Sequence, residues 1–381
     1  MSLVANWSYP TSIRFGAGRI VEIAEACKDI GIKKPLLVTD KGLAKLDITN
    51  KTLDILCKAG LGRSIFSDVD PNPTELNATS GIAIFKEGKH DGVIAFGGGS
   101  GIDLGKLIAF MVGQKRPIWD FEDVGDWWTR AETTGIKPII AIPTTAGTGS
   151  EVGRASVITN SQTKEKKIIF HPKFLPEVVI CDPELTVGMP SSITAGTGMD
   201  AFAHCLEAYC SPHYHPLSQG IALEGMRLVK ENLPIVFKDG NNISGRAHMM
   251  SAAIMGATAF QKGLGLIHAV SHPIGAVHNT HHGTTNAVVM QEALLINRCA
   301  IESKIESLCN YLNISGGFEG FLSFIKNLKI ILNIPSSLTE LGVKNPNIKA
   351  LAKSALNDPS CSSNPTKLTQ ENLISLLKNC L

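Results

Sequence analysis

The chain has 381 residues, of which 44% are hydrophobic and only 18% carry a charge, compared with about 25% in an average globular protein. This length suits about two or three domains, and the composition excludes a disordered chain. The 36 Lys and Arg residues nearly balance the 34 Asp and Glu residues, and no basic stripe is present, so we expect no nucleic-acid partner.

Three further observations predict the compartment. No apolar stretch reaches the ~18 residues of a membrane span, because Asp103 and Lys106 interrupt the longest candidate, residues 92–113. The first ten residues have neither the charged nor the apolar region of a secretory signal. The nine cysteines form no CxxC pair and are odd in number. We therefore expect a cytoplasmic protein with reduced thiols.

Short apolar runs alternate with helical patterns in the first half of the chain. The helical patterns lie near residues 19–30, 52–59, 74–85 and 102–112. The apolar runs predict strands at 35–39, 92–96, 138–142, 156–159 and 178–181. Runs that are continuously apolar indicate strands buried on both faces, and their alternation with helices indicates a Rossmann-like parallel sheet in an α/β domain.

The second half of the chain has a different pattern. Long helical segments occur at 198–209, 216–232, 246–260, 267–277 and from 287 to the end, with no convincing strand. Residues 182–190 contain two prolines and a glycine, which is typical of a linker. The sequence therefore predicts an α/β N-terminal domain at residues 1–188 and an all-α C-terminal domain at residues 189–381.

A glycine-rich turn follows the strand predicted at 92–96. Residues 97–100 read Gly-Gly-Gly-Ser and come directly before a predicted helix. Such a turn lets backbone N–H groups reach an anion, and the helix N-terminus adds a partial positive charge. A simple strand–helix turn is the alternative. The motif is not a Walker loop, because Ser100 and Leu107 stand where that loop requires Gly and Ser or Thr.

Two more features favour a dinucleotide. Asp40 follows the strand predicted at 35–39, where a carboxylate can accept hydrogen bonds from a ribose diol and repel a 2′-phosphate, which favours NAD over NADP. The alternative for Asp40 is an ordinary turn residue. A second loop of glycines and hydroxyl residues, at 143–151, follows another predicted strand. Two such loops indicate a nucleotide at the carboxyl edge of the sheet.

Histidines and an aspartate occur at metal-ligand spacing. Asp200 and His204 are four residues apart, as are His268 and His272, so each pair shares one helix face. Five histidines lie between residues 268 and 282 in a largely apolar segment, which core packing does not explain. An internal hydrogen bond is the alternative for the Asp200–His204 pair. One carboxylate with three imidazoles suits Fe²⁺, Zn²⁺, Co²⁺ or Ni²⁺.

Four motifs in order carry a resemblance that covers nearly the whole chain. They are GGGSGIDLGK (97–106), PTTAGTGSE (143–151), TGMDAFAHCLEAY (197–209) and GLGLIHAVSHPIGAVHNTHHG (263–283). Together they resemble the iron-containing, or group III, alcohol dehydrogenases. The resemblance implies the dehydroquinate synthase-like fold, which these enzymes share with glycerol dehydrogenases, and it implies a dinucleotide-binding N-terminal domain and a metal-binding C-terminal domain.

The resemblance also implies roles for single residues. His272 matches a histidine near the nicotinamide that is not a metal ligand, and we expect it to be the catalytic proton carrier. The implied metal ligands are Asp200, His204, His268 and His282. The implied cofactor-binding residues are Asp40, Asn72, Gly98, Gly99, Ser100, Asp103, Thr144, Thr145 and Lys166.

Some residues depart from the family pattern. Gly153 stands where Thr is frequent, and His278 and His281 stand where an aromatic residue and Pro are common. Trp127 and Trp128 either line the pocket or pack against the protein. Because these positions lie near the expected pocket, the sequence does not predict the substrate class, although it does predict the reaction type.

The expected function is that of a metal-dependent NAD(H) alcohol dehydrogenase. It would interconvert a small primary alcohol or diol and its aldehyde by hydride transfer, with Fe²⁺ as the expected metal and Zn²⁺ as the alternative. We expect no membrane partner and a homodimer or larger homo-oligomer. The alternatives are a dehydroquinate synthase-like or glycerol dehydrogenase-like enzyme, and a catalytically silent nucleotide- or metal-binding protein.

Overall fold

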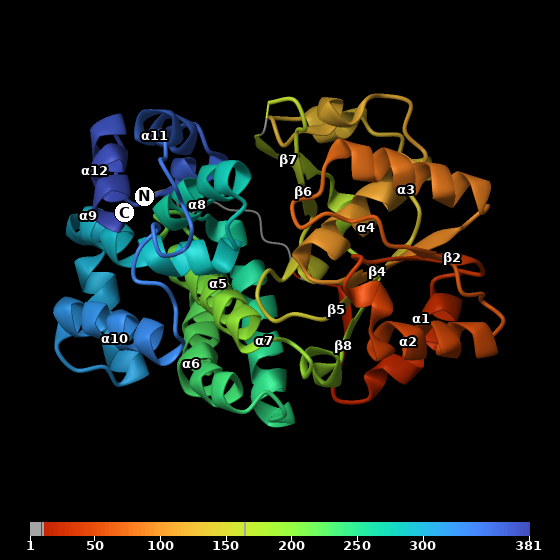
Figure 1. Ribbon diagram of the computed structural model, residues 1–381, viewed down its shortest axis with the longest axis horizontal. Helices are drawn as coiled ribbons and strands as arrows, with labels where there is room; N and C mark the ends of the chain where they lie inside the picture. The colour runs from red at the N-terminus through yellow and green to blue at the C-terminus, as the bar shows by residue number, and fades with distance from the viewer. Residues whose placement is uncertain (1–8, 10, 164) are drawn as a thin grey trace. The chain divides into compact units, whose positions relative to one another are not determined.

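The computed structural model describes residues 9, 11–163 and 165–381 (Figure 1). The described chain divides into two compact units. The α/β unit comprises residues 11–145 and 149–187, and the helical unit comprises residues 9, 146–148 and 188–381. Among the described residues, no helix is both long enough and apolar enough to cross a membrane. The first eight residues, which bear on the expected absence of a secretory signal, lie outside the described part.

A parallel sheet of six strands forms the core of the α/β unit. Its order is β1-β8-β5-β4-β2-β3, and every neighbouring pair is parallel. The strands are β1 (Ser12–Phe15), β2 (Pro35–Val38), β3 (Ile65–Phe66), β4 (Gly92–Gly97), β5 (Ile139–Pro143) and β8 (Val178–Cys181). The helices of this unit are α1 (Ile23–Asp29), α2 (Asp47–Lys58), α3 (Glu75–Glu87) and α4 (Gly99–Met111). The predicted fold class is confirmed, and β2, β4, β5 and β8 are buried along their whole length.

One predicted strand belongs elsewhere. The run at 156–159 lies in β6 (Ala155–Thr159), which pairs antiparallel with β7 (Lys166–Phe170) in a separate sheet of two strands. Its sequence resembles that of the parallel strands because β6 is also partly buried. β7 was not predicted, since two lysines open it and shorten its apolar run.

The segment at 182–190 is more ordered than the predicted linker. Asp182 is fully buried and accepts hydrogen bonds from the N–H groups of Gly18 and Ile20. It also accepts from the N–H of Glu184 and thereby caps a 3₁₀ helix at Pro183–Thr186. This segment is therefore fixed to the α/β unit as far as residue 187.

The helical unit is built around one buried helix. Its elements are α5 (Ser191–Cys210), α6 (Pro216–Lys238), α7 (Ile243–Ala259), α8 (Leu266–His278), α9 (His282–Leu312), α10 (Gly317–Ile331), α11 (Ile348–Leu356) and α12 (Gln370–Cys380). Every residue of α5 from Thr194 to Cys210 is buried, because α6, α7 and α9 pack against it.

The start of α9 lies against the backbone of α5. A Cβ atom at Gly283 would lie 2.0 Å from the carbonyl oxygen of Gly196, so only glycine permits this approach. His282 comes directly before Gly283, and Asp200 is one turn beyond Gly196 on α5. The close approach of the two helices therefore brings His282 toward Asp200.

Candidate active site

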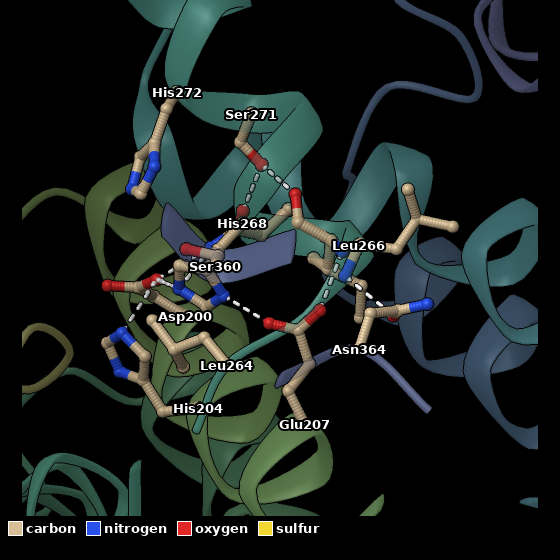
Figure 2. Close-up of polar contacts among 12 residues, drawn as sticks. Asp200, His204, Glu207, Leu264, Leu266, His268, Ser271, His272, Ser360 and Asn364 are labelled. Carbon is tan, nitrogen blue, oxygen red and sulfur yellow. Dashed lines mark hydrogen bonds and ion pairs between the residues drawn. The ribbon is translucent and has the colours of Figure 1, made fainter. Parts of the chain in front are cut away.

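Three helices of the helical unit bring the four predicted metal ligands together. α5 supplies Asp200 and His204, α8 supplies His268, and α9 begins at His282. The Nε2 atoms of His204, His268 and His282 lie 3.9, 3.7 and 3.5 Å from Asp200 Oδ1. In Figure 2 the side chains of Asp200, His204 and His268 point toward one another.

The spacing of these atoms fits a divalent metal ion. All three Nε2–Oδ1 distances exceed hydrogen-bond length. Ligands about 2.1 Å from a tetrahedral metal lie about 3.4 Å from one another, close to the separations found here. Asp200, His204 and His268 are buried, and one ligand atom from each lies within 4.8 Å of the others. Convergence of a carboxylate oxygen and imidazole nitrogens is what a metal of intermediate softness requires.

Mutual electrostatics shift the pKa values of this cluster. Burial acts to raise the pKa of Asp200, but His204, His282 and His268 outweigh it and hold that pKa well below its usual range. Burial lowers the pKa of His204 to about 4, against the attraction of Asp200. Burial would also lower the pKa of His268, but Glu207 and Asp200 raise it to about 9. The buried cluster thus attracts a positive charge, which a metal ion can supply.

Two further polar side chains contact the predicted ligands, and the sequence patterns identify neither of them. Glu207 contacts His268 on the ring nitrogen that faces away from Asp200, whereas Asn286 Nδ2 lies beside the converging atoms, 3.3 Å from His268 Nε2 and 3.4 Å from His282 Nε2. Glu207 Oε2 lies 2.6 Å from His268 Nδ1. Asn286 Nδ2 donates a hydrogen bond to Asp200 Oδ1 over 2.8 Å. The available signal was helical spacing, because Glu207 follows His204 by three residues and Asn286 follows His282 by four.

His272 lies beside the ligands without belonging to the cluster around Asp200 Oδ1. Its ring is nearly parallel to that of His282, with centroids 5.3 Å apart. Its Nδ1 lies 2.8 Å from Asp358 Oδ2. Burial acts to raise the pKa of Asp358, but His272 outweighs it and lowers that pKa. No local pattern could reveal Asp358, since it is 86 residues from His272 in the sequence.

His281, one of the departures from the family pattern, and the two tryptophans at 127 and 128 have structural partners. His281 is the N-cap of α9, and its Nδ1 accepts a hydrogen bond from the N–H of Thr284. It therefore helps to begin the helix that carries His282. Trp127 lies under the guanidinium of Arg130, at 4.1 Å from ring centroid to Cζ, and Trp128 packs edge-on against His171. These contacts favour packing over pocket lining for the two tryptophans.

The predicted cofactor residues lie in the α/β unit. β2, β4 and β5 are adjacent and parallel, so the residues that follow them, Asp40, Gly98 and Thr144, come to one edge of the sheet. α4 begins at Gly99, earlier than the predicted start at residue 102, which puts Gly99 and Ser100 in its first turn. A Cβ atom at Gly98 would lie 3.2 Å from Thr145 Cγ2. The arrangement presents a helix N-terminus and a backbone without side chains, as a pyrophosphate site requires.

The other predicted cofactor residues have varied surroundings. Ser100 Oγ donates to the carbonyl of Pro71, next to Asn72, and Lys166 is the first residue of β7. Asp103 accepts hydrogen bonds from Ser150 Oγ and from the N–H of Val157. Asp103 therefore fixes the loop around Ser150, and its role in cofactor binding stays a prediction.

The α/β unit offers a dinucleotide-type turn, and the helical unit offers a carboxylate with three imidazoles. Together they define a metal-dependent oxidoreductase. Residues 10–183 match the family model described as iron-containing alcohol dehydrogenase. Residues 194–381 match the model described as Fe-containing alcohol dehydrogenase family, C-terminal. The chain belongs to the iron-containing alcohol dehydrogenase family and is an oxidoreductase that acts on alcohols and aldehydes.

Named relatives match along nearly their whole length. The chain is 35% identical to 1,3-propanediol dehydrogenase of Klebsiella pneumoniae, over 96% of this chain and 95% of the relative. It is 33% identical to NAD-dependent methanol dehydrogenase of Bacillus methanolicus, over 99% and 100% of the two chains. The crystal structure of a 1,3-propanediol oxidoreductase superimposes with a TM-score of 0.93 at 34% identity, and 99% of each chain is covered. These matches favour an alcohol dehydrogenase over the alternatives.

Proposed function

We propose that the protein interconverts a small primary alcohol or diol and its aldehyde by hydride transfer to and from NAD. The metal ligands are Asp200, His204, His268 and His282, and the metal is Fe²⁺, with Zn²⁺ as the alternative. The observation that carries this proposal is the convergence of three imidazole nitrogens on Asp200 Oδ1 at 3.5–3.9 Å. The names of the relatives, which act on methanol and 1,3-propanediol, support a small substrate.

The chemistry divides between the bound groups and the side chains. A divalent ion supplies Lewis acidity that makes an alcohol O–H more acidic, and NAD⁺ supplies the hydride acceptor. His272 Nδ1 is engaged by Asp358, which leaves Nε2 to take the alcohol proton or return it. His272 therefore acts as the acid–base residue, and Asp358 orients it.

The cofactor residues have corresponding roles in this proposal. The N–H groups at Gly98, Gly99 and Ser100 bind the pyrophosphate, and Asp40 binds the adenosine ribose. The remaining contacts come from Asn72, Asp103, Thr144, Thr145 and Lys166. Thr144 Oγ1 is buried and has no hydrogen-bond partner among the described residues, which supports a cofactor contact there, since a buried hydroxyl without a partner is unfavourable.

The proposal also covers the domains of the enzyme, its oligomeric state and its cellular compartment. Residues 1–188 serve as the dinucleotide-binding domain and residues 189–381 as the metal-binding domain. We place the enzyme in the cytoplasm, as a homodimer or larger homo-oligomer without a nucleic-acid partner. A net charge of +2 and nine cysteines that are all free support this placement.

A direct assay tests the proposal. Metal-stripped protein is reloaded with Fe²⁺ under anaerobic conditions, or with Zn²⁺, and mixed with NAD⁺ and a panel of alcohols from methanol to hexanol, including 1,3-propanediol. We expect NADH absorbance to rise for at least one primary alcohol or diol, and Asp200→Ala to abolish both metal binding and turnover. A protein shown to hold metal that oxidises none of these alcohols would overturn the proposal.

A further inference from the structure

Glu207 contacts both a metal ligand and the start of the helix that carries that ligand. It lies on α5, and its side chain is only 7% exposed. Oε2 lies 2.6 Å from His268 Nδ1, and Oε1 accepts a hydrogen bond from the N–H of Ile267 over 2.6 Å. Figure 2 shows its carboxylate between the His268 ring and the backbone of α8.

The N-terminus of α8 depends on side chains from other elements. Its N-cap, Gly265, has no side chain that can cap the helix, so the first N–H groups need partners from elsewhere. Asn364 Oδ1 accepts from the N–H of Leu266, and Glu207 accepts from the next N–H. A Cβ at position 265 would lie 3.0 Å from Asn364 Oδ1 and 3.1 Å from Glu207 Oε1, so the glycine leaves room for both.

The contact with Glu207 decides which nitrogen of His268 is available. A histidine that binds a metal through Nε2 must carry its proton on Nδ1, and the partner of Nδ1 fixes this tautomer and the ring orientation. His268 directs Nε2 toward Asp200 and Nδ1 toward Glu207. A carboxylate only accepts hydrogen bonds when ionised, and here each of its oxygens faces one donor.

We propose that Glu207 is a positioning residue of the metal site. It keeps His268 in the tautomer with Nδ1 protonated and fixes the ring by tying it, through Ile267, to the start of α8. It acts through His268 and touches neither metal nor substrate. This inference rests on the metal site in the proposed function, but not on the identity of the substrate.

Glu207→Gln tests the proposal with almost no change in volume. The amide has one acceptor oxygen in place of two, so it cannot accept from both Ile267 and His268. If its NH₂ group faces His268, it donates to Nδ1 and forces the proton onto Nε2, where it blocks metal binding. We expect Co²⁺ and Zn²⁺ to bind the metal-stripped variant about 10–100-fold more weakly in chelator competition, with a changed visible spectrum for Co²⁺.

Two matched variants separate this role from general stability. Asn364→Ala removes the hydrogen bond that the N–H of Leu266 donates to Asn364, but it leaves the contacts of His268 in place. It should therefore lower the melting temperature and largely retain Co²⁺ affinity. Asp358→Asn alters the carboxylate beside His272, so it should retain Co²⁺ affinity and change the pH profile of turnover. Equal losses of Co²⁺ affinity in all three variants, or an unchanged affinity in E207Q, would overturn the proposal.

A second substitution covers the case in which E207Q does not fold. Glu207→Asp keeps a carboxylate but shortens the side chain. We expect E207D to melt at a temperature similar to that of N364A and to bind Co²⁺ more weakly than both N364A and wild type. Affinity equal to that of N364A would contradict the proposal. Metal affinity is measured without substrate, so a wild-type protein that binds Co²⁺ but oxidises no alcohol would reject the function and leave this inference standing.

Discussion

Asp40 uses one carboxylate oxygen to shape its own turn. Oδ1 accepts hydrogen bonds from the N–H groups of Gly42 and Leu43, whereas Oδ2 accepts none from the described residues. The side chain therefore has two separable properties, an acceptor that holds the turn and a negative charge that acts on the cofactor.

Asp40→Asn should change cofactor preference without loosening the turn. The amide oxygen can still accept from Gly42 and Leu43, while the charge that repels a 2′-phosphate is gone. We expect the KM for NADP⁺ to fall about tenfold, which corresponds to about 1.4 kcal/mol of binding free energy, with little change in melting temperature. Asp40→Ala serves as the control, because it also loses the turn acceptor, at a cost of about 1 kcal/mol. If Asp40→Asn discriminated against NADP⁺ as strongly as wild type does, the charge of Asp40 would not be what excludes the 2′-phosphate.

At the residue scale, helical spacing predicted two pairs of side chains, and the family resemblance implied the roles of the single residues, His282 among them. The spacing paired Asp200 with His204 and His268 with His272, because residues four apart share a helix face. It did not assign Glu207 or Asn286, because spacing alone does not distinguish a ligand from the residue that orients it. Asp358 was beyond any local pattern, since tertiary folding alone brings it to His272.

The crossing of α5 and α9 is the element-scale feature on which the site depends most directly. Gly283 and Gly196 let the two backbones approach, and His282 and Asp200 lie at this crossing. By contrast, Gly220 lies on the exposed face of α6, where an added Cβ would meet nothing within 4 Å.

Gly283→Ala and Gly220→Ala should therefore have opposite effects. A methyl group at Gly283 forces the helices apart, which should cost about 1–3 kcal/mol of unfolding free energy and weaken Co²⁺ binding. The same methyl group at Gly220 should stabilise α6 by about 0.5–1 kcal/mol and leave metal binding unchanged. Urea unfolding and chelator competition measure both. If Gly283→Ala were as stable as wild type, the close approach would not determine the site.

The strands show where sequence patterns stop being informative. β2, β4, β5 and β8 were predictable because burial on both faces makes their residues continuously apolar. The pairing of β6 with β7 was not, because the two lysines that open β7 shorten its apolar run, so that the sequence offers β6 no recognisable partner strand. β1 escaped prediction because Ser12 and Arg14 interrupt its apolar residues, and β3 because it has only two residues.

At the scale of the whole molecule, the chain passes between the two units several times. It leaves the α/β unit after residue 145, returns at 149 and leaves again after 187. Within the helical unit, Gly147 lies against α5, where a Cβ would be 2.6 Å from Thr197 Cβ. Three residues of a loop that follows β5 thus complete the surface of the helical unit.

A fragment of residues 188–381 should therefore differ from the same residues in the full chain. Without residues 146–148, the surface of α5 at Thr197 is exposed, although Thr197 is buried in the full chain. We expect the fragment to melt at a lower temperature and to bind Co²⁺ more weakly than the full chain. Equal melting temperature and affinity would show that the loop tip contributes nothing to the helical unit.

This arrangement also limits how relatives can be recombined. A chimera joined at residue 188 would place the α5 of one parent beneath the loop tip of the other, and Gly147 and Thr197 would then come from different proteins. An exchange that preserves this contact therefore needs both residues 188–381 and residues 146–148 from the same parent. Since neither unit corresponds to one continuous stretch of the gene, residues on the two sides of this contact are expected to change together as the family diverges.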